Sequence, residues 1–109
     1  MRLPMSQAAT GLLRALIGRA GVQRDRILLS NWTSVDWQSL TFVGERHTIL
    51  MRIAGPHSEA VAGRMIHGLE DADFVIPGQI VADISVVGEP KPWGDGSTEL
   101  SLEALTIAE

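Results

Sequence analysis

Apolar residues recur at helical spacing in two segments of the chain, and each segment is expected to form one helix. Between residues 6 and 20 they return every three or four positions, which gives that helix one buried stripe. Ser6 is a suitable N-cap for it, and Gly21 is a suitable stop. The second helix is expected to begin at Gly55-Pro56, with proline in its first turn, and to end near residues 68–71.

A region rich in strand-forming residues follows the first helix. Residues 27–42 are expected to be extended, either as one strand or as two strands divided by a bend near residues 33–35. Residues 47–53 alternate between apolar and polar side chains, which predicts the returning strand of a hairpin. Gly44-Glu45 offers the glycine that a type II′ turn needs at its first central position, so the hairpin turn is expected there.

The register of this hairpin decides which face of the sheet each side chain occupies. A two-residue turn at Gly44-Glu45 places Trp37 opposite Arg52 on the outer face, and this is the register we expect. A three-residue turn is the alternative, and it would bring Trp37 onto the core face. Trp32 shares its parity with Leu28 and is expected in the core.

The last part of the chain predicts two more strands around a loop. Residues 79–87 alternate, with one set of apolar side chains pointing inward: Ile80, Ala82, Ile84 and Val86. Residues 89–97 contain two prolines and two glycines and are expected to form a loop. In the final strand a β-bulge near Ala104 would keep four apolar residues on the core face: Leu100, Leu102, Leu105 and Ile107.

The element order α-β-β-α-β-β predicts the α+β class. We expect a two-layer α/β sandwich, in which both helices lie on one face of an antiparallel sheet of four or five strands. A chain of 109 residues is typical of one domain, so residues 1–109 are expected to form a single unit, with residues 1–5 flexible.

Composition narrows the classes of function. A hydrophobic fraction of 45% with 20% charged residues is typical of a globular protein, and the net charge of −4 argues against a nucleic-acid partner. No apolar run reaches the ~18 residues of a membrane span, and the N-terminal segment lacks the apolar centre of a secretion signal. We therefore expect no membrane partner and a cytoplasmic location. Eight arginines against one lysine indicate a GC-rich bacterial genome.

Charge is distributed unevenly between the two parts of the chain. Residues 1–65 hold all eight arginines against four acidic residues, a net charge of +4, whereas residues 66–109 hold nine acidic residues against Lys91, a net charge of −8. Two interpretations are open. The charges either face each other or water within one fold, or they form complementary patches between subunits.

Catalysis and metal binding have little support in the sequence. The absence of cysteine excludes thiolate chemistry, and no nucleophile elbow, phosphate loop or dinucleotide fingerprint is present. His57 and His67 lie about 15 Å apart on one helix, so they cannot share an ion. We therefore expect no metal, no cofactor and no enzymatic activity.

The outer face of the predicted sheet is more apolar than a solvated face normally is. Its members form the candidate interface: Trp37, Arg46, Leu50, Arg52, Val81 and Val87. Tryptophan and arginine are enriched where proteins bind each other, and a shared apolar patch indicates an interface. The alternative is an isolated surface pair of Trp37 and Arg52.

The sequence thus predicts a binding or scaffolding module that self-associates through its open sheet face, as a symmetric dimer, and that is compatible with a further protein partner. The alternative is a small enzyme or ligand-binding domain with a pocket between the Gly44 hairpin and the Trp93 loop. Asp36, Glu45 and His47 would supply the polar groups of that pocket.

Overall fold

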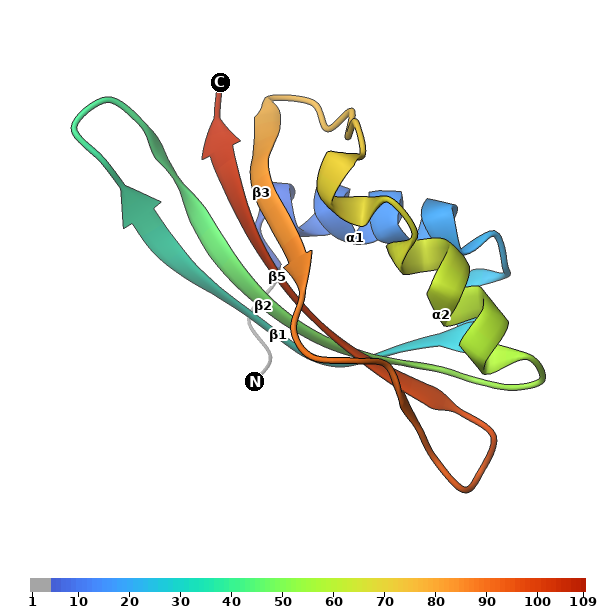
Figure 1. Ribbon diagram of the computed structural model, residues 1–109. Helices are drawn as coiled ribbons and strands as arrows, with labels where there is room; N and C mark the ends of the chain where they lie inside the picture. The colour runs from blue at the N-terminus through green and yellow to red at the C-terminus, as the bar shows by residue number, and fades with distance from the viewer. Residues whose placement is uncertain (1–4) are drawn as a thin grey trace.

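The computed structural model of the protein describes residues 5–109, in which two α-helices accompany an antiparallel sheet of five strands (Figure 1). The elements are α1 (Gln7–Ala20), β1 (Ile27–Gln38), β2 (Val43–Ile53), α2 (Ser58–Ile66), β3 (Gln79–Val86), β4 (Lys91–Pro92) and β5 (Thr98–Ala108). Short 3₁₀ turns occupy Arg24–Arg26 and Leu69–Asp71. The predicted α+β class and antiparallel sheet are confirmed. Of the segment expected to be flexible, residues 1–4 lie outside the described part.

The order of elements needs one correction. The described chain follows α-β-β-α-β-β-β, because the segment expected to be a loop contains β4, in which Lys91 pairs with Glu99 and Pro92 with Thr98. Proline is tolerated there because β4 lies at the edge of the sheet, where its missing N–H costs no ladder bond. The first β region is one continuous strand. The alternative with a bend near residues 33–35 is therefore wrong, and the one irregularity in the pairing of β1 with β2 lies between Leu29 and Asn31.

The ends of the helices follow local chemistry. Ser6 caps α1, since its Oγ accepts a hydrogen bond from the Ala9 N–H at 3.1 Å, and Gly21 ends the helix in the left-handed region at φ 69°. α2 begins at Ser58 and not at Pro56, because His57 stands before it at φ 62° and interrupts the helical backbone.

The core joins both helices to the inner face of the sheet, which is the face defined by Ile49 and Met51. Its fully buried large apolar side chains come from α1, β2, α2, β5 and the 3₁₀ turn at Leu69–Asp71: Leu12, Leu16, Ile49, Met51, Ile53, Met65, Leu69, Leu100 and Leu102. The helices do not cover the whole sheet. Figure 1 shows the turn of the β1–β2 hairpin extending past them, and Leu40 and Phe42 at this turn are exposed. The expected sandwich is therefore incomplete at this end.

The strand order is β1-β2-β5-β3, with β4 also paired to β5. β5 pairs continuously with β2 from Ile107 opposite Gly44 to Thr98 opposite Ile53. The bulge expected near Ala104 is therefore absent from β5, and Leu105 and Ile107 lie on the outer face, opposite to the core. A register shift lies in β3 instead, between Val81 and Asp83.

The β1–β2 turn lies at residues 39–42 and not at Gly44-Glu45. Ser39 donates its N–H to the Phe42 carbonyl at 2.8 Å, and its Oγ accepts from the Phe42 N–H at 3.0 Å. A serine side chain that binds the backbone in this way stabilises a turn without glycine. Both registers considered from the sequence are therefore wrong, and Trp37 lies opposite Gly44.

Gly44 is required by a close approach between strands. It lies within β2, and a Cβ atom built on it would overlap the carbonyl oxygen of Thr106 in β5. The overlapping atom belongs to backbone in the middle of the sheet, so it cannot move aside as a flexible side chain would.

We expect Gly44→Ala to lower the free energy of unfolding by about 1–3 kcal/mol, the usual cost of forcing an extra methyl into a packed site. Gly63 is the matched control, because it is exposed in α2 and a Cβ on it meets nothing within 4 Å. Gly63→Ala should stabilise the protein by about 0.5–1 kcal/mol through helix propensity. Urea unfolding of the two variants measures the direction of each change in the free energy of unfolding. A Gly44→Ala variant as stable as the wild-type protein would contradict the close approach of the strands.

Candidate functional site

The outer face of the sheet is apolar at one end and polar in its centre. Paired residues form rows across the strands, and the row nearest the β1–β2 turn contains Trp37, Gly44, Ile107 and Ile80. The next row adds Val35 and Leu105, which alternate with the charged residues Arg46 and Asp83. By contrast, a central row contains only polar residues: Thr33, Thr48, Glu103 and Ser85. We call Val35, Trp37, Ile80, Leu105 and Ile107 the apolar end patch.

Two members of the apolar end patch are well exposed, Val35 at 60% and Ile80 at 50%. Trp37 and Ile107 are half-buried, and Leu105 is buried. Gly44 leaves the middle of the row without a side chain, so Trp37 lies beside an open position on β2. The patch therefore presents a shallow apolar surface to water.

The structure places most of the predicted interface residues on the outer face, although not as the sequence arranged them. Arg46, Leu50 and Arg52 alternate along β2 on this face, and Val87 is 46% exposed just after β3. Val81 is the exception. The register shift after it turns its side chain inward, where it packs against the core.

Sequence reasoning missed four members of the apolar end patch: Val35, Ile80, Leu105 and Ile107. Leu105 and Ile107 alternate correctly for the outer face if β5 contains no bulge, so the signal was present in the spacing. Ile80 could not be found this way, because the register shift in β3 reverses its side.

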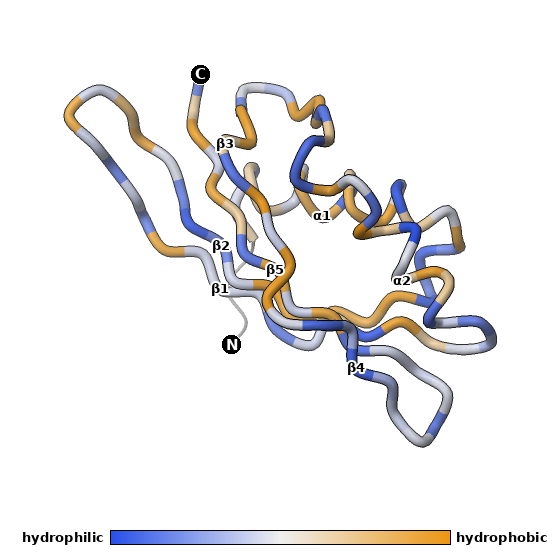
Figure 2. Tube along the Cα trace, in the orientation of Figure 1, coloured by the Kyte–Doolittle hydropathy of each residue, from blue (hydrophilic) through white to orange (hydrophobic). Residues whose placement is uncertain are grey.

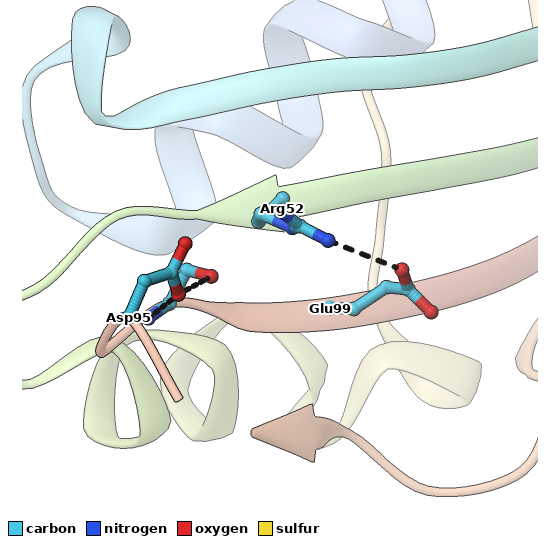
Figure 3. A network of polar contacts seen from close by, with 4 residues as sticks. Arg52, Asp95 and Glu99 are labelled. Carbon is cyan, nitrogen blue, oxygen red and sulfur yellow. Dashed lines mark hydrogen bonds and ion pairs between the residues drawn. The ribbon is translucent and has the colours of Figure 1, made fainter. Parts of the chain in front are cut away.

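Charges on the outer face divide along the boundary between β2 and β5. Arg46 and Arg52 lie on β2, whereas Glu99 and Glu103 lie on β5 and Asp83 on β3. In the fold, the uneven charge of the sequence therefore places basic residues on β2 beside acidic residues on β5 and β3. The two charges that meet most closely are Arg52 and Glu99, at 3.9 Å between Nη2 and Oε1 (Figure 3).

Trp93 belongs to this charged end of the sheet. The guanidinium of Arg52 lies 4.2 Å from the centre of the Trp93 ring, and the Lys91 ammonium lies 5.0 Å from it. Asp95 in the same loop is bound to Ser97, whose hydroxyl donates to Oδ1 at 2.6 Å and whose N–H donates at 3.0 Å (Figure 3). These hydrogen bonds hold the pKa of Asp95 below its usual value.

His47 anchors a buried polar network on the inner face. Ser34 lies directly opposite it on β1, and Ser34 Oγ is 2.8 Å from His47 Nδ1. On its other side, His47 Nε2 is 2.9 Å from Thr106 Oγ1 of β5. The Trp32 indole N–H donates to Ser34 Oγ at 3.0 Å. The side chain of His47 is completely buried.

The hydrogen bonds of this network indicate a neutral imidazole. The Trp32 indole N–H, which can only donate, lies 3.2 Å from His47 Nδ1 as well as 3.0 Å from Ser34 Oγ, so Nδ1 accepts and carries no proton. Nε2 then carries the ring proton and donates it to Thr106. Burial lowers the pKa of His47, and the neighbouring Glu45 carboxylate opposes this by a smaller amount. Both ring nitrogens are occupied within the chain.

The four residues predicted for a ligand pocket do not meet in one. Asp36 and Glu45 face each other on the inner face, one row beyond His47. Trp93 packs on Arg52, which lies eight residues from Gly44 along β2 and thus roughly 26 Å away at ~3.3 Å per residue. The expected pocket between the Gly44 hairpin and the Trp93 loop is not formed.

Asp36 and Glu45 border a depression of about 370 Å³ at the uncovered end of the inner face, where Gln38 and Gln79 are also polar lining residues. Glu45 is tied to the start of α1, since Ser6 donates its hydroxyl to Glu45 Oε1 at 2.6 Å. This contact places a carboxylate at a helix N-terminus, where the helix dipole favours it.

No group of three or more histidine or acidic side chains in residues 5–109 is arranged to hold a metal ion. Within the same residues, neither helix has the length and apolar character to cross a membrane. The chain matches no model of a known protein family, and a comparison with curated protein sequences finds no significant match.

The His47 network should make stability depend on pH. Because the pKa of His47 is lowered in the folded state, the unfolded chain binds a proton first as the pH falls below about 6.5. The neutral, buried His47 therefore contributes fully to the free energy of unfolding above about pH 6.5, and this contribution is lost as the pH falls through the pKa of His47 in the folded state. We expect the free energy of unfolding to decrease between about pH 7.5 and pH 5, and this decrease to be smaller in His47→Gln.

His57→Gln is the matched control, because it replaces an exposed histidine and should keep the decrease. An NMR titration of the wild-type protein gives an independent reading if His47→Gln does not fold. A midpoint for the His47 ring at or above about 6.5 would contradict the buried neutral form.

Proposed function

We propose that this protein is a binding module that self-associates through the outer face of its sheet as a symmetric dimer. The observation that carries the proposal is the apolar end patch, in which Val35 is well exposed near Trp37 on β1 and Ile80 is well exposed beside Ile107 across the sheet. A sheet face turned to water is normally polar, and the Thr33–Ser85 row of the same face follows that rule. An apolar patch confined to one end indicates a contact surface.

The distribution of charge supports a second copy as the partner. Basic residues on β2 and acidic residues on β5 and β3 lie on the same face, on opposite sides of its midline. A two-fold axis along this midline places β2 of one copy over the acidic strands of the other. Complementary potentials of this kind favour the correct pairing over others. The same face therefore carries both parts of a self-complementary surface.

The module would act by binding or scaffolding, and the sheet face would also be available to another protein of similar charge pattern. A bacterial origin and a cytoplasmic location remain the predictions made from composition.

A ligand-binding or small enzymatic role is the second candidate. The depression bordered by Asp36 and Glu45 supports it, because two carboxylates opposite each other suit a cationic or hydroxyl-rich ligand. His47 lies in the adjacent row, but both of its ring nitrogens are occupied by Ser34 and Thr106. Its availability as an acid or base would require this network to open.

Light scattering of the wild-type protein should report a mass above 11.8 kDa. Trp37→Ser should shift the mass toward the monomer, because truncating a tryptophan that anchors an interface costs about 2 kcal/mol or more, which is roughly 30-fold in Kd. Val75→Ser is the matched control. Val75 is 93% exposed but lies in the segment before β3, so its loss should leave the mass unchanged.

A wild-type protein that stays monomeric at about 0.1 mM has no dimer of useful affinity and would refute self-association. That result would favour the ligand-binding or enzymatic role of the depression at Asp36 and Glu45. It is tested by a thermal-shift screen of small cationic and hydroxylated compounds, in which a stabilising compound should lose its effect in Asp36→Asn.

A further inference from the structure

The second half of β1, residues 33–38, is held less firmly than the first half. β1 pairs with β2 alone among the described strands. Its side chains that pack against the core are Ile27, Leu29 and Trp32, and none of these lies beyond residue 32. Figure 2 shows hydrophobic residues in the turn that follows β1, away from the helices, and Leu40 and Phe42 in this turn are exposed. Residues 33–38 therefore depend on the ladder with β2 and on the contacts of their polar side chains.

His47 supplies the side-chain hydrogen bonds that join β1 to β2. Within residues 5–109, the side chains of β1 that form hydrogen bonds to another strand are Trp32 and Ser34, and both bind His47 Nδ1, at 3.2 and 2.8 Å. The Trp32 indole also packs edge to face on the imidazole, with 5.7 Å between the ring centres. The His47 ring is completely buried, and on the β1 side Trp32 and Ser34 cover it.

Protonation of His47 favours movement of this part of β1. A charged imidazole without water is unfavourable, and Nδ1 with a proton no longer accepts from Trp32 or Ser34. An edge strand is the element most easily moved, because it loses pairing on one side only. Moving residues 33–38 away would bring the ring into water, where its pKa returns toward the ordinary value of about 6.5. A fall in pH therefore favours the open arrangement.

The charges on neighbouring strands oppose the effect of burial without removing it. Glu45 lies two residues from His47 on the same face of β2, and Asp36 lies opposite Glu45 on β1. The Glu45 carboxylate favours the imidazolium, but burial has the larger effect and lowers the pKa of His47. β5 faces the ring with Ala104 and Thr106, which are uncharged.

The remaining elements bring no charge to the ring. β3 contributes Ile84 to the same row, and this residue is apolar. The charged side chains of α1 are Arg14 and Arg19, which lie about 12 Å or more along the helix axis from Ser6, the residue that binds Glu45. In the part of the chain that the structure describes, the two carboxylates are therefore the charges that face the ring.

The rest of the domain can stay folded while residues 33–38 open. These residues contribute no side chain to the core, and the ladder between β2 and β5 does not involve them. Opening a segment at the edge of a sheet needs less free energy than global unfolding. The change is therefore local to the strand that carries part of the outer face.

We propose that protonation of His47 releases residues 33–38 of β1 from β2 and thereby controls self-association. Val35 and Trp37 of the apolar end patch belong to this segment, so the patch is complete only while the segment is paired. The dimer should therefore form at neutral pH and dissociate as the pH falls. This inference rests on the proposed function and adds its regulation.

The release can be measured in the monomer by NMR. In Trp37→Ser, at a concentration where light scattering reports the monomer, the His47 ring and the Trp32 indole N–H should titrate with one midpoint between about pH 5 and pH 6.5. Exchange of the Trp32 indole hydrogen with water, relative to that of the exposed Trp93, should rise by about tenfold or more across this midpoint. A Trp32 indole that stays protected down to about pH 5 would overturn the release.

The effect on the dimer is measured in the wild-type protein. At the midpoint half of the chains are open, and both copies must be closed to associate, so the Kd should be about fourfold higher than at pH 7.5. His57→Gln should retain this increase, whereas His47→Gln should lose it. These two variants have the same net charge, so their comparison corrects for the approach to the isoelectric point of about 5.3.

The outcomes separate this regulation from the proposed function. A wild-type protein that is monomeric at pH 7.5 would refute self-association and its regulation together. A dimer whose Kd is the same at pH 7.5 and at the midpoint would refute the regulation alone, as would an equal increase of Kd in His47→Gln. If His47→Gln does not fold, the common midpoint of His47 and Trp32 in the monomer still decides whether protonation releases the strand.

Discussion

The pairing of β2 with β5 is the interaction on which the rest of the structure depends. It joins ten consecutive residues of each strand without a register shift, from Gly44 opposite Ile107 to Ile53 opposite Thr98. These residues lie roughly half the chain apart in sequence, so the ladder connects the basic and acidic parts of the protein. The close packing of Gly44 against Thr106 is a local condition of this ladder, since any side chain at Gly44 would separate the strands.

The same ladder creates a gradient along the inner face. Ile49, Met51 and Ile53 lie under the helices with Leu100 and Leu102, where apolar burial provides the main stabilisation. One row further His47 lies opposite Ala104, and in the row after that Thr106 lies opposite Glu45. Both ring nitrogens of His47 find a partner. A buried histidine satisfied in this way specifies the register of β1, because Ser34 must lie opposite it. Beyond the row of Glu45 and Thr106, the β1–β2 hairpin extends past the helices and its turn is exposed (Figure 1).

The uncovered parts of the sheet are where function has to be sought. Apolar side chains on the outer face, the open edge of β1 and the apolar turn at Leu40 all lie toward the β1–β2 hairpin. The opposite end of the outer face is closed locally, since Arg52 is held by Glu99 and Trp93. The charged end of the outer face is therefore paired within the chain, whereas the end near the β1–β2 hairpin leaves apolar side chains exposed. Contact with another chain would bury them.

The sequence by itself determined the helices, the α+β class and the alternation of β2, because these depend on local spacing and on capping residues such as Ser6 and Gly21. It also placed Trp37 on the outer face, since the true partner, Gly44, is eight residues from the expected Arg52, and an even displacement preserves the face. Trp32 was correctly expected in the core, but for the wrong reason: Leu28 faces outward, and the irregularity at Ser30 reverses the parity between them.

Only the tertiary structure decided the site of the turn, the two register shifts and therefore the positions of Val81, Ile80, Leu105 and Ile107. The physical reason is that a single-residue shift in a strand exchanges its two faces, and such a shift is selected by hydrogen bonding and packing with strands distant in the sequence. The apolar end patch arises from these long-range choices. Its residues are ordinary in the sequence and become a surface only when the strands are aligned.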